Sequence, residues 1–129
     1  MGSENTAKTI KTFQDLYAWE EGHKLVLAVY SVTRGFPASE NFALTGQMRR
    51  AVVSVTSNVA EGFSRRSQKD KTHFYSMALG SLTELQNQIY VATDVGYLNN
   101  GKAEELKASA ITVHKLINGL IKSTKTLNS

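Results

Sequence analysis

Three histidines are the residues of this chain best suited to acid–base chemistry near neutral pH or to metal binding. His23, His73 and His114 stand far apart, and none is followed by a second ligand three or four residues on, the spacing that places two ligands on one helix face. The repeated Glu-x-x-His motifs of di-iron bundles are not present, and the chain has no cysteine. The sequence therefore predicts no metal site.

The motifs of nucleophilic and phosphate chemistry are absent as well. The chain has no G-x-S-x-G elbow, no P-loop and no G-x-G-x-x-G turn, and "NNGK" at residues 99–102 is typical of a turn. A serine without a placed base is a weak nucleophile, and no such base is evident. We therefore predict that the protein is not an enzyme and has no catalytic residue and no cofactor.

Positive charge is the chemical feature that the sequence concentrates. Residues 47–75 carry six cations against two carboxylates, and the segment after residue 100 carries five lysines against two glutamates. Clustered cations suit phosphate groups, so we assign a candidate nucleic-acid-binding set. Its members are Arg49, Arg50, Arg65, Arg66, Lys69 and Lys71. Ordinary solvation is the alternative, and it is the better interpretation for a monomer; in an oligomer, repeated weak patches act together.

Four segments show the three- and four-residue apolar spacing of amphipathic helices. We expect them at residues 13–34, 39–64, 68–95 and from about 99 to 127. Gly35, in a left-handed conformation, and Pro37 would end the first, and Ser39 would cap the second. Ser67 and Asp70 resemble a capping box at the start of the third.

Short turns between four helices predict an all-α, antiparallel up-down-up-down four-helix bundle over residues 12–127, preceded by a flexible tail at residues 1–11. The core stripe expected in the first helix is Leu16, Trp19, His23, Val26 and Tyr30. The stripe expected in the third is Phe74, Ala78, Leu82, Leu85, Ile89 and Ala92. No uninterrupted apolar run could span a bilayer, and the N-terminus lacks the apolar centre of a secretory signal. We therefore expect a cytoplasmic protein with no membrane partner.

The segment "AVVSVTSNVA" at residues 51–60 has no charge, although a surface helix normally has a charged outer face. The third helix repeats this pattern, since Glu84 is the only charged residue between His73 and Thr93. Burial of these faces between copies of the chain is the economical arrangement, so we predict a homo-oligomer. A monomer with a scattered apolar surface is the alternative.

The residues expected at the interface between copies are small or polar. They are Gln47, Ser54, Ser57, Asn58, Glu61, Gly80 and Glu84. Asn58 and Glu61, one helical turn apart, suit ligand binding or hydrogen bonds between helices; we favour the second role, with Arg50 or Arg65 of a neighbouring copy pairing with Glu61.

Glycines interrupt the expected helices at Gly22, Gly46, Gly80 and Gly119. Each costs about 1 kcal/mol relative to alanine. The close approach of another backbone would explain them, whereas simple tolerance is the alternative.

Two long stretches, "FQDLYAWEEGHKLVLAVYSVTRGFPASENFALTGQMRRAVVSVTSNVAEGFSRR" and "FYSMALGSLTELQNQIYVATDVGYL", resemble the 23S rRNA intervening-sequence proteins of bacteria. The specific parts are "FP" with Q-x-RR-A, "SNVAEG", "GSL-x-EL" and "GYL". Many members carry proline where Thr56 stands. The motifs fall on Gln47, Arg49, Arg50, Asn58, Glu61, Gly62, Gly80, Ser81 and Glu84.

This resemblance implies a four-helix bundle that assembles into a homopentamer. It also implies that some members originate in reading frames inside rRNA genes, and a related retroelement accessory protein works with a reverse transcriptase and RNA through a basic surface. No defined biochemical activity comes with the family. We therefore expect an oligomer that binds structured RNA or an RNA-processing protein, with a protein-interaction scaffold that does not bind nucleic acid as the alternative.

Overall fold

The computed structural model describes residues 8–127, with side chains to residue 125. Four α-helices account for most of this range: α2 (Tyr17–Thr33), α3 (Leu44–Ser64), α4 (Gln68–Asp94) and α5 (Asn100–Leu127). Two short 3-10 helices, η1 (Phe13–Asp15) and η2 (Ala38–Glu40), precede α2 and α3. No strand occurs in the described range. The prediction of an all-α fold with four helices is confirmed.

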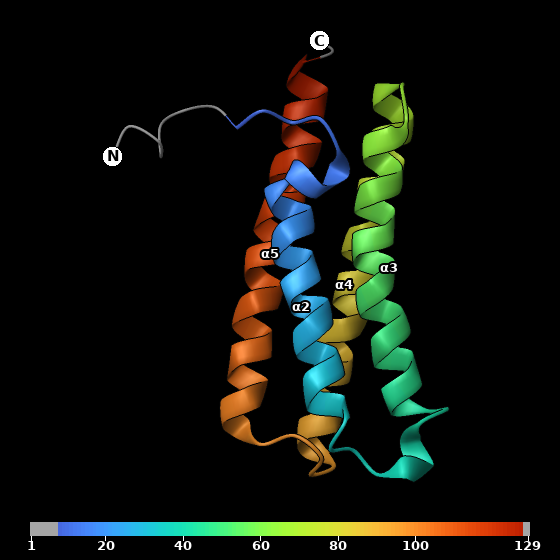
Figure 1. Cartoon of the computed structure of the whole chain (residues 1–129), viewed down its shortest axis with the longest axis vertical. Helices are drawn as coiled ribbons and strands as arrows, with labels where there is room; N and C mark the ends of the chain where they lie inside the picture. Colours follow the sequence, from blue (N-terminus) through green and yellow to red (C-terminus); the bar gives the residue numbers. More distant parts are fainter. Residues whose placement is uncertain (1–7, 128–129) are drawn as a thin grey trace.

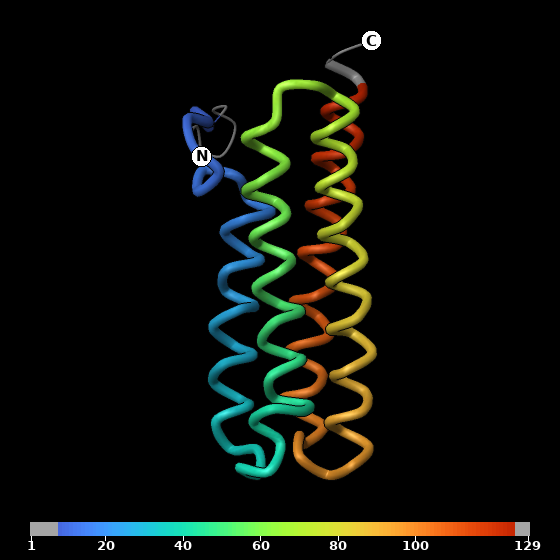
Figure 2. Tube along the Cα trace, turned by 90° about the vertical axis from the view of Figure 1, so that its right-hand side faces the viewer, coloured from blue at the N-terminus to red at the C-terminus, as the bar shows by residue number. Residues whose placement is uncertain are grey.

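The α-helices lie side by side along the long axis of the molecule (Figure 1), and consecutive helices are joined at alternating ends (Figure 2). Contacts link α2 to α3, α3 to α4, α4 to α5, and α5 back to α2. Helices adjacent in sequence are therefore neighbours in space, and α5 completes the bundle against α2. No helix in the described range combines the length and the apolar character needed to cross a bilayer.

The core consists of aliphatic side chains from all four α-helices. Fully buried members include Leu25, Val29, Met48, Val52, Val55, Leu82, Leu85, Ile89, Val113 and Ile117. The stripe predicted for α4 is correct except at its start, where Tyr75, 2% exposed, takes the place expected for Phe74. Gly62 explains the exchange, because a Cβ there would lie only 2.6 Å from Cε1 of the Tyr75 ring.

The stripe predicted for the first helix is partly wrong. Leu25 and Val29 form the centre of the buried face of α2, whereas His23 is exposed and Trp19 and Tyr30 are half-buried. The physical reason is that two apolar stripes overlap on this helix. The aliphatic stripe packs into the core, and the aromatic side chains lie at its edge. There the Trp19 ring stacks on His23, and the Tyr30 ring contacts the guanidinium of Arg49.

Two helix starts differ from the sequence prediction because carboxylates, rather than hydroxyls, bind the free backbone N–H groups. Asp15 Oδ2 accepts from Lys11 N at 2.9 Å and Thr12 N at 3.0 Å, and these hydrogen bonds lower the pKa of Asp15. The first segment therefore forms η1, and α2 begins only at Tyr17. Similarly, Glu40 Oε1 accepts from Leu44 N at 3.1 Å, so α3 begins at Leu44 and Ser39 is not its cap.

The remaining helix ends are closer to prediction. Ser67 Oγ accepts from Asp70 N at 3.0 Å at the start of α4, and Asn99 Oδ1 accepts from Lys102 N at 2.8 Å at the start of α5. The left-handed glycine is Gly96, with φ +91°, and not Gly35. Gly96 lies at the C-terminus of α4, where the N–H of Tyr97 bonds the carbonyl of Ala92 at 2.9 Å, as in a Schellman motif.

The helix glycines divide into two kinds. A Cβ at Gly22 would lie 2.9 Å from Thr56 Cγ2, and one at Gly46 would lie 2.8 Å from the carbonyl oxygen of Asn41, so neighbouring segments explain both. Gly80 and Gly119 have no atom within 4 Å of an added Cβ. Contacts within the single chain therefore explain why glycine is needed at two of these four positions, Gly22 and Gly46.

Of the tail predicted at residues 1–11, residues 1–7 lie outside the described range. Lys8 forms an ion pair with Glu20, and its ammonium group lies 4.2 Å from the ring centroid of Tyr17. From Lys8 onward the segment therefore contacts α2.

Candidate nucleic-acid interface

The turn between α3 and α4 carries four of the six predicted nucleic-acid-binding residues at one end of the bundle. Arg65 and Arg66 directly follow α3, and Lys69 and Lys71 lie in the first turn of α4. The Ser67 cap starts α4 within this run, so the chain reverses direction over only three residues. Local capping therefore holds these four cations close together.

Two of the four cations have structural partners. Arg65 Nη2 lies 2.8 Å from Glu61 Oε2, and its guanidinium carbon lies 4.6 Å from the ring centroid of Phe74. Lys71 Nζ donates to the Phe63 carbonyl at 2.7 Å and caps the C-terminus of α3, while burial lowers the pKa of Lys71. Much of the bonding capacity of these two side chains is therefore used within the turn.

Arg66 and Lys69 are the other two cations of the turn. Both are exposed, and neither has an ion pair or a side-chain hydrogen bond within residues 8–125. Their charged groups point into solvent at the end of the bundle, so they are the members of the set best placed to contact phosphate.

Arg49 and Arg50 do not join this cluster. They lie near the start of α3, about 22 Å from Arg65 along the helix at 1.5 Å per residue. Arg49 Nε donates to Thr33 Oγ1 at 3.0 Å, and its guanidinium carbon lies 4.6 Å from the ring centroid of Tyr30. The six predicted residues therefore form two separate groups, one at each end of α3.

The C-terminal part of α5, with Lys122 and Lys125, adds positive charge to the end of the bundle that carries the basic turn. The C-terminus of α5 and the α3–α4 turn lie at the same end of the bundle (Figures 1 and 2). Residues 61–71 and 119–125 together hold six cations and two carboxylates, a net charge of +4, whereas residues 34–44 and 94–105 at the opposite end hold two cations and four carboxylates. Sequence reasoning identified both basic segments but not that parts of the two lie at the same end of the bundle.

The outer face of α3 and α4 contains the predicted interface residues. Ser54 Oγ and Ser81 Oγ lie 2.8 Å apart and link the two helices, and Asn58 Nδ2 donates to the carbonyl of Ser54 at 2.9 Å. Glu61 is exposed and pairs with Arg65 of its own chain. Asn58 thus forms hydrogen bonds within α3, and the predicted pairing of Glu61 with a neighbouring copy stays a prediction.

A polar hollow of about 410 Å³ opens on this face. It is lined by Gln47, Arg50, Ala51, Ser54 and Glu84. Gln47, Arg50, Ser57, Gly80 and Glu84 are exposed. On α4, Gln88 is 5% exposed, and its Oε1 has no hydrogen-bond partner among the described residues.

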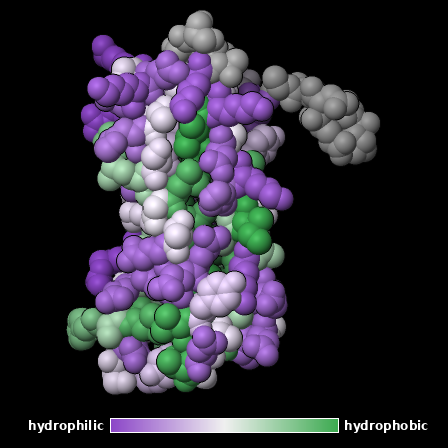
Figure 3. All heavy atoms as spheres, turned by 180° about the vertical axis from the view of Figure 1, so that it is seen from behind, coloured by the Kyte–Doolittle hydropathy of each residue, from purple (hydrophilic) through white to green (hydrophobic). Residues whose placement is uncertain are grey.

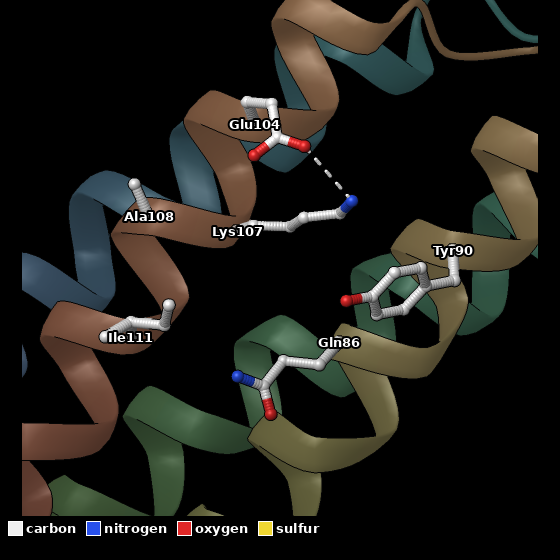
Figure 4. A pocket seen from close by; sticks show the side chains of 6 residues that line it. All are labelled: Gln86, Tyr90, Glu104, Lys107, Ala108 and Ile111. Atoms are coloured by element: carbon white, nitrogen blue, oxygen red, sulfur yellow. Dashed lines mark hydrogen bonds and ion pairs between the residues drawn. The ribbon is translucent and has the colours of Figure 1, made fainter.

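A second hollow, of about 440 Å³, lies between α4 and α5 (Figure 4). Lys107 Nζ lies 3.3 Å from Glu104 Oε1 and 4.4 Å from the ring centroid of Tyr90, while Ile111 lines the same hollow. Seen from behind, hydrophobic residues form a vertical strip over the upper part of the bundle, and more of them lie near its lower end (Figure 3). Sequence reasoning missed this groove, because its residues come from two helices and form no motif.

The histidines do not gather ligands for a metal. Glu20 and His23 do stand in Glu-x-x-His spacing, but Glu20 pairs with Lys8 and the His23 ring stacks on Trp19 at 4.7 Å between centroids. Over residues 8–125, no three histidine, aspartate or glutamate side chains come together as a ligand set. His114 instead lies 3.1 Å from Asn118 Nδ2 through its Nδ1.

Comparison with known proteins identifies a matching protein family and a solved structure with a similar fold. The sequence model of the 23S rRNA-intervening sequence proteins matches residues 14–119. Among solved structures, a protein of unknown function from the S23 ribosomal protein family of Bacteroides thetaiotaomicron superposes with a TM-score of 0.75 at 16% identity. The match covers 81% of this chain and 95% of that chain, and it supports the fold. No curated protein matches the sequence.

Proposed function

Because the chain belongs to the 23S rRNA-intervening sequence protein family, we propose that it is a non-catalytic RNA-binding subunit. In this proposal the antiparallel four-helix bundle assembles into a homo-oligomer, with a pentamer as the expected ring, and binds structured RNA in the cytoplasm. Its basic end, which we define as residues 61–71 and 119–125, makes the contact.

One observation carries the proposal: the basic α3–α4 turn and the C-terminal part of α5, which carries Lys122 and Lys125, lie at the same end of the bundle (Figure 1). A net charge of +4 on this end attracts the phosphate backbone. Arg66 and Lys69 can approach phosphates without breaking an ion pair of the described structure. Each phosphate contact releases condensed counterions, so binding should weaken steeply as salt is raised.

The exposed face of α3 and α4 supports self-association. Gly80, Ser57 and Ser54 are small, which lets the backbone of another helix approach closely, and an added Cβ at Gly80 meets no atom of its own chain. In a ring, each basic end is repeated, so weak contacts with one RNA act together.

The proposal is tested by titrating a labelled RNA hairpin with the full-length chain and following fluorescence anisotropy. The double variant Arg66→Glu with Lys69→Glu should weaken binding by about tenfold or more, and the slope of log K against log salt should fall by about two for each subunit in contact. Arg34→Glu with Lys102→Glu changes the net charge equally at the opposite end, so it should weaken binding far less.

Three outcomes would contradict the proposal. The wild-type chain could fail to bind the hairpin at low salt, or the two double variants could lose affinity equally. The RNA could also be cleaved during incubation, which would contradict the non-catalytic role. Gel analysis of the recovered RNA checks the last point, and full-length RNA is the expected result.

A protein-interaction scaffold is the second candidate function. The groove between α4 and α5 favours it, because Tyr90 is 55% exposed there and Ile111 is 50% exposed, and aromatic anchors beside aliphatic ones are typical of partner contacts. Ile111→Glu would then abolish the contact with the partner protein. Co-purification of a protein that survives nuclease treatment, together with no RNA binding, would favour this second function over the first.

A further inference from the structure

We infer that the basic end binds base-paired RNA through its phosphates alone, without stacking bases on aromatic side chains. This inference rests on the proposed RNA binding and narrows its substrate class. It comes from the aromatic rings, because proteins that bind single strands usually offer ring faces on which successive bases stack. The question is therefore which ring faces remain open in this molecule.

The rings around the basic end are covered by its own cations. The guanidinium of Arg65 lies over Phe74 at 4.6 Å, and the ammonium of Lys71 lies over Phe63 at 5.4 Å. Tyr75 is buried behind them in the core. A base that stacked on the covered face of either phenylalanine would have to displace the cation that lies there. The displaced cation would then be farther from the phosphate of the same nucleotide, so the electrostatic attraction would weaken.

Cations also lie over one face of three tyrosines, Tyr17, Tyr30 and Tyr90, at 4.2, 4.6 and 4.4 Å from the ring centroids. Tyr17, which lines a hollow with Gly119 and Leu120 of the basic end, is 58% exposed, and Tyr90 is 55% exposed. On each of these rings a base would have to share the ring with a cation or displace it, which disfavours stacking.

The other aromatic residues are also accounted for within residues 8–125. Phe13 and Trp19 pack edge to face, Trp19 stacks on His23, and Phe36 packs against Tyr97. Phe42 is the exception, since its side chain is 99% exposed and has no ring or cation partner among the described residues. It lies just before α3, about 30 Å from the basic turn along that helix, too far to stack a base whose phosphate contacts Arg66.

A surface that reads only phosphates favours the nucleic acid with the denser charge. A duplex carries about one charge per 1.7 Å of axis, twice the density of one strand, and the salt exponents are about 0.9 and 0.7 per phosphate contact. With about five phosphate contacts, the salt exponents of duplex and single-strand binding differ by about one. If the two affinities are equal at 1 M salt, the duplex should therefore bind about tenfold more tightly at 0.1 M salt. Binding should also be indifferent to the sequence of the stem.

The test compares three labelled RNAs with the full-length protein in one buffer. They are a hairpin, a second hairpin of equal length with a scrambled stem, and an unpaired RNA of the same length. We expect the two hairpins to bind within about twofold of each other and the unpaired RNA to bind about tenfold more weakly. We also expect Phe42→Ala to leave all three affinities unchanged within about twofold, because no base stacks on that ring.

Equal or tighter binding of the unpaired RNA would overturn the inference while leaving the proposed RNA binding intact. A large difference between the two hairpins would overturn it as well, because it would require contacts with bases. Loss of unpaired-strand affinity in Phe42→Ala would have the same meaning. If none of the RNAs binds at low salt, the proposed function itself fails, so the two failures are distinguishable.

Discussion

At the scale of single residues, the basic turn contains cations of two kinds. Lys71 points back onto the end of α3 and donates to the carbonyl of Phe63 at 2.7 Å, whereas Lys69, two residues earlier, points into solvent. Unpaired carbonyls at a helix C-terminus need a donor, and a buried stem with a charged tip provides one. The two lysines therefore share a sequence neighbourhood but not a role.

Replacing each lysine by methionine should separate these roles. Lys71→Met keeps the apolar stem but loses the hydrogen bond, so the free energy of unfolding should fall by about 1 kcal/mol. Lys69→Met should change it by less than about 0.5 kcal/mol but weaken RNA binding. Urea denaturation and hairpin titration of both variants measure the two effects. Equal destabilisation by the two substitutions would show that Lys71 is not a cap.

At the scale of the helix elements, Gly62 decides which aromatic side chain enters the core. The ring of Tyr75 occupies the space where a side chain at position 62 would stand, with its Cε1 and Cδ1 atoms 2.6 and 2.8 Å from an ideal Cβ. This contact brings the end of α3 close to the start of α4 directly beneath the basic turn. The geometry of that turn therefore depends on a glycine.

Gly62→Ala should lower the free energy of unfolding by about 1–3 kcal/mol, because the Tyr75 ring must move out of a packed position. Gly119→Ala is the matched control in α5, where an added Cβ meets no atom within 4 Å. That substitution should stabilise the protein by up to about 1 kcal/mol through helix propensity alone. Chemical denaturation of both variants checks the prediction, and a neutral Gly62→Ala would refute the tight contact.

At the scale of the whole molecule, the fold separates charge along the long axis and leaves one face of α3 and α4 with little charge. Gly80 lies on that face, and Gly119 lies on α5; both are exposed and open in the single chain. If copies of the chain assemble through the face of α3 and α4, the two glycines should respond differently to added bulk.

Gly80→Gln and Gly119→Gln test this assembly, because glutamine is a good helix former and adds a long polar side chain. Both should favour the helix by about 0.5–1 kcal/mol, but only Gly80→Gln should weaken self-association. Sedimentation velocity over a dilution series gives the oligomeric state. A wild-type chain that sediments as a monomer at all concentrations, or two variants that behave alike, would contradict assembly through this face.

Much of the helical structure could be read from the sequence. The four helices, the start of α4 at Gln68 and the cap at Ser67 agree with the structure, because apolar spacing and capping act over a few residues. The starts of α2 and α3 could not, because Asp15 and Glu40 bind backbone N–H groups in competition with the expected helix. That competition depends on the geometry of the turns before the helices, which the spacing of apolar residues does not predict.

By itself, the sequence determined that the protein is all helical, that its positive charge gathers in two segments and that α3 and α4 each have a face with little charge. Only the tertiary structure decided which of these features meet. It places the end of α5 at the same end of the bundle as the α3–α4 turn and separates Arg49 from Arg65. It also places cations against five of the aromatic rings. The physical reason is range: periodicity and caps act within a few turns of one helix, whereas these contacts join side chains of different elements and exist only once the bundle has packed.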